Sequence, residues 1–117
     1  MAKKPIISIG LWFDKHAEEA ANFYKSLFAG SSIDQILRYG SEGQETHNQE
    51  PGSVMVVSFQ LAGLHFQAIN GGPVFKINPS ISLYVVTESE GETEALWNEL
   101  LPGGNVEVQS FLPVMFR

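Results

Sequence analysis

The sequence contains no cysteine among its 117 residues. This absence excludes disulfide bonds, a cysteine nucleophile and thiolate metal sites. A cysteine-free chain is typical of reducing compartments. The apolar run that follows the basic start, Met1–Pro5, is also shorter than the apolar segment of a secretory signal peptide. We therefore expect a cytoplasmic protein.

Basic residues and long apolar runs are also scarce. The chain has 7 Lys and Arg against 13 Asp and Glu, which gives a net charge of −6. It has no basic stripe that could neutralise phosphates, which argues against nucleic acid and anionic membrane as partners. No apolar run approaches the roughly 20 residues of a membrane span. We expect neither a nucleic-acid nor a membrane partner.

The sequence motifs of several common enzyme classes are missing as well. There is no G-x-S-x-G, no H-E-x-x-H and no glycine-rich phosphate loop. No Rossmann-like glycine motif follows a strand. Three acids, Asp14, Asp34 and Glu107, have apolar neighbours, but helix capping explains the first and outward strand positions explain the other two. We therefore expect no cofactor and assign no catalytic residue.

What is present begins with a strand and a helix between Ile6 and Phe28. The strand is predicted over Ile6–Phe13, and Asp14 is predicted to cap the helix that follows. Small and aromatic residues recur there at helical spacing: Ala17, Ala20, Ala21, Tyr24, Leu27 and Phe28. Gly30 stands where a left-handed residue is expected after the helix.

The rest of the chain alternates between strand and helix patterns. Ser53 to Ala62 is the clearest strand, because Met55, Val57, Phe59 and Leu61 alternate with Val54, Val56, Ser58 and Gln60. The predicted elements are strands over 31–39, 53–62, 64–70, 81–87 and 106–116, a polar loop over 40–52 and a helix over 89–101. The order is βαβββ followed by βαβ, an internal repeat within one α+β domain.

Two stretches resemble a known family. Leu11–Phe28 reads L-W-F-D-x-x-A-E-E-A-x-x-F-Y-x-S-L-F and Ala68–Pro73 reads A-I-N-G-G-P. Both resemble the PhnB-like (3-demethylubiquinone-9 3-methyltransferase-like) family of the vicinal oxygen chelate, or glyoxalase and bleomycin-resistance, superfamily. The resemblance implies paired βαβββ modules whose curved mixed or antiparallel sheet surrounds a ligand cleft, with helices on the outer face.

On this pattern, residues 1–117 form a single domain with module one over 6–70 and module two over 80–117. The second module lacks its last two strands. Either the chain is truncated from a longer or tandem protein, with another copy beginning near Val108, or the likeness of its end to Ile9–Asp14 is a coincidence. An incomplete module leaves a sheet edge unpaired, so we expect a homodimer.

Metal enzymes of this superfamily hold a divalent ion between His and Glu side chains. Ser8 and Ser80 occupy what look like ligand strands here, which leaves His65 alone. His16 and His47 are predicted to be surface residues. We therefore expect no metal.

The residues that we expect to line the cleft are Trp12, His65, Gln67, Asn70 and Tyr84. Trp12 has a second interpretation, as a core residue between the first helix and the sheet. The predicted function is metal-independent binding of a small molecule. The alternatives are a divalent-metal-dependent lyase, isomerase or dioxygenase-type enzyme, and an interaction module that acts as a dimer. The element order is wrong for the doubly wound sheet of a methyltransferase.

Overall fold

The computed structural model describes residues 5–75 and 82–103, without the side chain of His47. Contacts divide the chain into two compact units, Met1–Lys76 and Ile77–Arg117.

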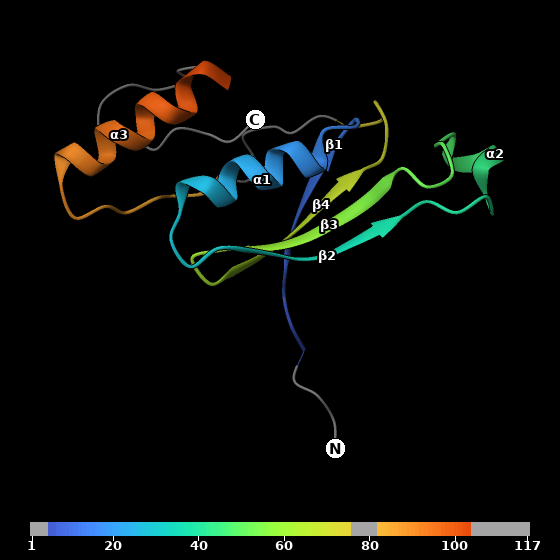
Figure 1. Cartoon of the computed structure of the whole chain (residues 1–117), viewed down its shortest axis with the longest axis horizontal. Coiled ribbons are helices and arrows are strands. Elements are labelled where there is room, and N and C mark those ends of the chain that lie inside the picture. Colours follow the sequence, from blue (N-terminus) through green and yellow to red (C-terminus); the bar gives the residue numbers. More distant parts are fainter. Residues whose placement is uncertain (1–4, 76–81, 104–117) are drawn as a thin grey trace. The chain divides into compact units, whose positions relative to one another are not determined.

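The first unit contains four strands and two helices (Figure 1). They are β1 (Ile9–Phe13), α1 (Ala17–Leu27), β2 (Ser32–Arg38), α2 (Gln44–His47), β3 (Val54–Leu61) and β4 (Leu64–Asn70). Apart from the short α2, this is the predicted βαβββ order. The α+β class is confirmed.

The four strands form one mixed sheet with the order β1-β4-β3-β2. β1 runs parallel to β4, and the other neighbouring pairs are antiparallel. Ala62 and Gly63 join β3 to β4 with φ of +50° and +89°, the left-handed conformation that a tight two-residue hairpin turn requires.

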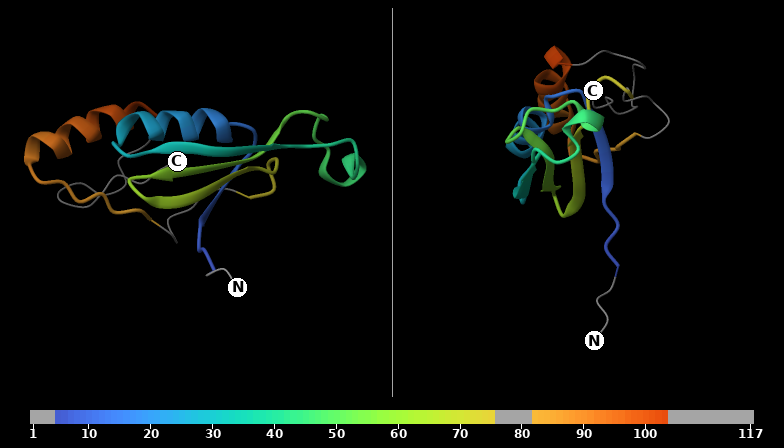
Figure 2. Two further views of the ribbon diagram at one scale, coloured as in Figure 1. Left: turned by 60° about the horizontal axis from the view of Figure 1, so that its bottom comes forward. Right: turned by 90° about the vertical axis from the view of Figure 1, so that its right-hand side faces the viewer.

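The core lies between α1 and one face of the sheet. Val57, Phe59 and Phe66 are essentially inaccessible to solvent, and the rings of Phe59 and Phe66 stack with centroids 5.1 Å apart. α1 packs on β3, β4 and β2 (Figure 2), and its residues Ala17 and Ala21 are buried. Because alanine has little bulk, the helix axis can approach the sheet closely.

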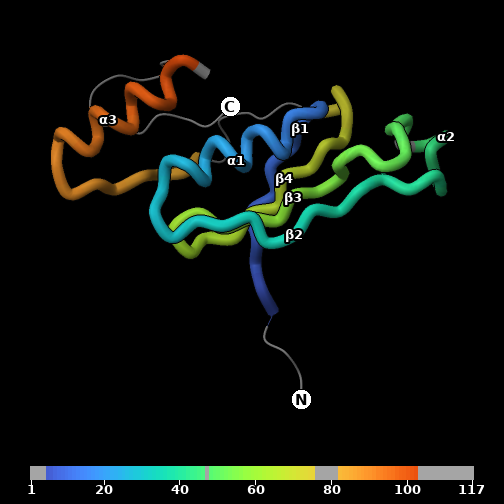
Figure 3. Tube along the Cα trace, viewed as in Figure 1, coloured from blue at the N-terminus to red at the C-terminus, as the bar shows by residue number. Residues whose placement is uncertain are grey.

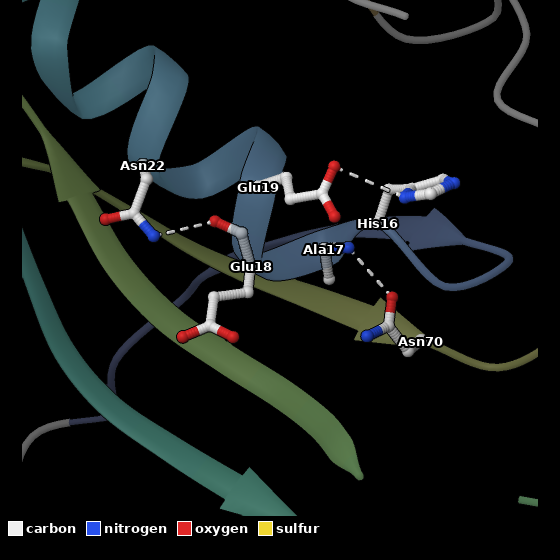
Figure 4. Close-up of polar contacts among 6 residues, drawn as sticks. All are labelled: His16, Ala17, Glu18, Glu19, Asn22 and Asn70. Atoms are coloured by element: carbon white, nitrogen blue, oxygen red, sulfur yellow. Dashed lines mark hydrogen bonds and ion pairs between the residues drawn. The ribbon is translucent and has the colours of Figure 1, made fainter.

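The start of α1 corrects one prediction. The N-cap position is His16 rather than Asp14, and no side chain within the helix segment caps it. Instead, the Ala17 amide donates to Oδ1 of Asn70 at 2.8 Å (Figure 4). A side chain from β4 therefore satisfies an amide that a local cap would otherwise satisfy. Gly30 has the predicted left-handed φ, +73°.

The polar connection between β2 and β3 extends beyond the end of the sheet and contains α2 (Figure 3). Its base is closed by two backbone hydrogen bonds, from Tyr39 N to Ser53 O and from Gly52 N to Tyr39 O. Gly43 and Asn48 flank α2 in left-handed conformations.

The second unit contains α3 (Glu90–Leu100) and a 3-10 turn, η1 (Leu101–Gly103). Ser89 caps α3 by accepting a hydrogen bond from Glu92 N at 3.2 Å, so the predicted helix is confirmed. The predicted strand Ile81–Thr87 is wrong over residues 82–87, which form no strand. Tyr84 and Val86 are 72% and 93% exposed, and no described residue pairs with this segment. The predicted strand Val106–Phe116 lies outside the described residues.

Candidate functional site

The sheet of the first unit has a second face, opposite α1, that no helix of this unit covers (Figure 2). We call it the helix-free face. Side chains alternate between the two faces of a strand. The residues next in sequence to the buried Phe59, Phe66 and Ala68, together with their register partners, therefore belong to the helix-free face. They form three rows across the sheet.

The first row is apolar and crosses all four strands. It joins Trp12, Ile69, Val56 and Leu37, each of which is the register partner of the next. Leu37 is 42% exposed, and the other three are half-buried. This apolar row presents a continuous surface of a kind that commonly lines ligand sites.

The next two rows are polar. Gln67, Ser58 and Gln35 form one, and His65, Gln60 and Ser32 form the other. Within the first polar row, the Ser58 hydroxyl donates to Oε1 of Gln67 at 2.7 Å. Beside the second, Asp34 accepts from Ser32 Oγ and Gln60 Nε2, both at 2.8 Å. The polar side chains are therefore linked laterally on the surface of the sheet.

Asp34 lies where the register of β2 and β3 shifts between Ile33 and Gln35. The hydrogen bond from Gln60, and then the one from Ser32, lower the pKa of the Asp34 carboxyl; the charge of His65 acts in the same direction. These partners stabilise the ionised form. Asp34 is thus a carboxylate beside the polar rows.

Trp12 lies at the end of the apolar row against the turn after β4. Its indole Nε1 donates to the Gly72 carbonyl at 2.9 Å, and its ring meets that of Phe75 edge-on with centroids 4.9 Å apart. A Cβ on Gly71 would lie 2.1 Å from the indole Cζ2, so only glycine fits there without displacement. The interpretation of Trp12 as a core residue under α1 is therefore wrong.

Asn70 lies on the opposite face from the other predicted residues of β4. It is 5% exposed, and besides accepting from Ala17 it donates Nδ2 to the Val54 carbonyl at 3.1 Å. Its backbone carbonyl accepts from the Tyr39 hydroxyl at 2.5 Å. Asn70 joins the start of α1 to β3, and we do not place it among the ligand-contacting residues.

The structure thus brings Trp12, His65 and Gln67 to one face. It places Tyr84 in the second unit, where the ring is exposed. Ser58, Gln60 and Asp34 lie beside His65 and Gln67, although they are not among the residues predicted to line the cleft. Ser58 and Gln60 could have been predicted from the sequence, because the alternation in Val54–Leu61 places them on the face opposite the core.

Neither metal binding nor a membrane span is evident in the described ranges. Residues 5–75 and 82–103 contain no group of three or more His, Cys, Asp or Glu side chains placed to hold a metal ion. The helices described there are neither long nor apolar enough to cross a membrane.

Comparison with known proteins identifies the family. The model of the family described as 3-demethylubiquinone-9 3-methyltransferase matches residues 5–112. None of the curated proteins compared with the chain matches it.

Solved structures are also similar to the chain. One is a PhnB protein from Bacillus cereus, provisionally described as a 3-demethylubiquinone-9 3-methyltransferase. It is 38% identical, with a TM-score of 0.68 over 80% of this chain and 71% of that one. A protein from Staphylococcus aureus is 31% identical, with a TM-score of 0.44 over 92% of this chain and 77% of that one. The chain belongs to the 3-demethylubiquinone-9 3-methyltransferase, or PhnB-like, family and has its glyoxalase and bleomycin-resistance-like fold.

Proposed function

We propose that this protein binds a small organic molecule on the helix-free face without a metal ion. The observation that supports this proposal is the order of the three rows, one apolar and two polar, in register across the sheet. Ligand sites combine apolar walls with a few polar groups that fix orientation. The fold of the family does not by itself identify an activity, and the proposal does not rest on the methyltransferase description.

The rows favour a ligand with two chemically different ends. A flat apolar or aromatic part fits the apolar row of Trp12, Ile69, Val56 and Leu37. Groups that both donate and accept hydrogen bonds fit Gln67 and Ser58, because an amide and a hydroxyl can each do both. The carboxylate of Asp34 beside the second polar row disfavours an anionic group at that end.

A thermal-shift screen of small amphiphilic compounds tests this proposal. A compound that binds only the folded state raises the midpoint in proportion to the logarithm of its concentration. The screen is run with and without a chelator, and we expect the same hits in both, since no metal takes part. Hits that disappear with the chelator would favour the metal-dependent alternative.

Variants then locate the binding surface. We expect Gln67→Ala to weaken a hit by about tenfold, as loss of a hydrogen bond worth roughly 1.4 kcal/mol would. Asn22→Ala is the matched control, because Asn22 is an exposed amide on α1 (Figure 4) whose Nδ2 donates to the Glu18 carbonyl at 3.0 Å. Equal weakening by both variants would contradict the proposed surface.

We also propose that the protein works as a homodimer. β1 forms one edge of the sheet, and no strand among the described residues pairs with its outer side. Ile6 and Ile7, which lead into β1, are 75% and 89% exposed. Exposed edges and apolar side chains favour association with a second copy. Light scattering should give twice the chain mass at micromolar concentration, and a monomer mass there would refute the dimer.

For location we propose the cytoplasm, because the sequence contains no cysteine and disulfide bonds are characteristic of oxidising compartments. Cell fractionation with an antibody to the chain tests this. Recovery of the protein outside the cytoplasmic fraction would overturn it.

A further inference from the structure

Asn70-Gly71 is the one place in the sequence where glycine follows asparagine. Among dipeptides that begin with asparagine, this one is the most susceptible to spontaneous deamidation. The backbone nitrogen of the following residue attacks the asparagine side-chain amide, and glycine has no side chain that hinders this attack. The fold also favours glycine at position 71, since a Cβ there would displace the Trp12 ring. The fold therefore keeps a chemically labile pair at this position.

In the folded chain the two polar side-chain atoms of Asn70 and the attacking nitrogen of Gly71 are all held in other hydrogen bonds. Oδ1 of Asn70 accepts from Ala17 N at 2.8 Å (Figure 4), and Nδ2 donates to Val54 O at 3.1 Å. The attacking nitrogen, Gly71 N, donates to Phe13 O at 3.0 Å. The side chain of Asn70 is also 5% exposed, which limits access by water.

We propose that Asn70 is a spontaneous deamidation site that the fold keeps inactive, and that it reacts when the junction between β1, α1 and β4 opens. Gly71 N loses its proton to water or hydroxide and forms a bond to Asn70 Cγ. The bond from Cγ to Nδ2 breaks, and the leaving nitrogen takes a proton from water to become ammonia. Water then adds to either carbonyl of the cyclic imide, the bond from that carbonyl carbon to the ring nitrogen breaks, and the nitrogen takes a proton, which yields aspartate or isoaspartate. No oxidant or reductant is needed.

The product does not fit the junction as asparagine does. The carboxylate can still accept from Ala17 N, and the helix N-terminus favours its negative charge. However, the Nδ2 donor to Val54 O is lost, which leaves two acceptors facing each other on a buried side chain. Isoaspartate also lengthens the backbone between β4 and Gly71. Each opening that leads to reaction therefore destabilises the junction permanently.

Peptide mapping by mass spectrometry tests the proposal on the full chain in mildly alkaline buffer. Deamidation at Asn70 is followed in native buffer and in guanidinium chloride. We expect the native rate to be at least about tenfold lower, since reaction is limited to the fraction of molecules that are open. Asn48, which is exposed, provides an internal reference for the chemistry in each buffer.

A second comparison tests whether opening of this junction is the trigger. Tyr39→Phe removes the hydroxyl that donates to the Asn70 carbonyl. We expect it to raise the native rate about two- to tenfold, as the loss of one hydrogen bond would. Tyr84→Phe makes the same chemical change at an exposed ring in the second unit and should leave the rate unchanged.

Two results would overturn the proposal. The first is deamidation at Asn70 that is as fast in native buffer as in denaturant, or absent from both. The second is an equal rate in the Tyr39→Phe and Tyr84→Phe variants, which would show that the junction does not control the reaction.

Discussion

The two faces of the sheet in the first unit use the same strands for different purposes. On the α1 face, Val57, Phe59 and Phe66 are fully buried, and both amide atoms of the buried Asn70 bond to the fold. On the helix-free face, the side chains are half-exposed and the polar rows bond laterally to one another. Alternation along one strand therefore assigns the core to one face and leaves the side chains of the other face unburied by the first unit.

The largest expected loss of stability comes from truncating a buried side chain on the α1 face. We expect Phe59→Ala to lower the free energy of unfolding by about 3–5 kcal/mol, since it leaves a cavity beside Phe66 in a core that cannot fully collapse. Denaturant unfolding monitored by circular dichroism measures this loss.

Leu37→Ala is the matched substitution on the helix-free face. Leu37 is 42% exposed, so we expect a loss of about 1 kcal/mol or less. If Phe59→Ala and Leu37→Ala lowered the free energy of unfolding equally, the two faces would not differ in their contribution to stability.

An intermediate effect is expected where β1 meets the turn after β4. Gly71→Ala places a methyl group 2.1 Å from Trp12 Cζ2, so the indole must move. We expect a loss of about 1–3 kcal/mol, as for overpacking elsewhere, and a shift in Trp12 emission, measured in a Trp97→Phe background.

Gly10→Ala provides the control on the helix-free face. A Cβ at Gly10 would meet nothing within 4 Å, so stability and Trp12 emission should be unchanged to within about 0.5 kcal/mol. A Gly71→Ala protein as stable as Gly10→Ala would disprove the close packing of the indole on this turn.

The smallest expected effect concerns Asp34. Its pKa is lowered chiefly by the hydrogen bond from Gln60. The carboxylate therefore stabilises the fold fully above its unfolded pKa, about 3.9, and this contribution is lost as the pH falls through the lower folded-state pKa.

Gln60→Ala should move the Asp34 pKa upward, and an NMR titration of the carboxyl carbon follows it. Gln67→Ala is the control, since Gln67 bonds to Ser58 in the neighbouring row. An unchanged Asp34 pKa in Gln60→Ala would refute this account of the polar rows.

Local patterns predicted most of the first unit. The alternation in Val54–Leu61 correctly separated core from surface, and the spacing of Ala17, Ala21 and Tyr24 identified the buried side of α1. The cap of α1 was not predictable in this way, because its partner, Asn70, lies 53 residues away. The segment 81–87 had a strand pattern, but a pattern cannot supply a partner strand.

The candidate site was predictable to a smaller extent. Trp12, His65 and Gln67 do share a face, and the alternation within 64–70 predicts this for the last two. Asn70 is the last residue of the same strand and has the opposite parity, so the alternation places it on the other face. The link from Asp34 to Gln60 depends on a register shift in β2, which residue types alone do not encode.

The most direct test of the central claim is chemical-shift mapping on the isotope-labelled chain with a compound from the thermal-shift screen. If the helix-free face is the binding surface, the largest shifts will fall on Ser58, Gln67 and Ile69. Shifts concentrated on the exposed side of α1 or in the connection over 40–52, with those three residues unmoved, would contradict the account.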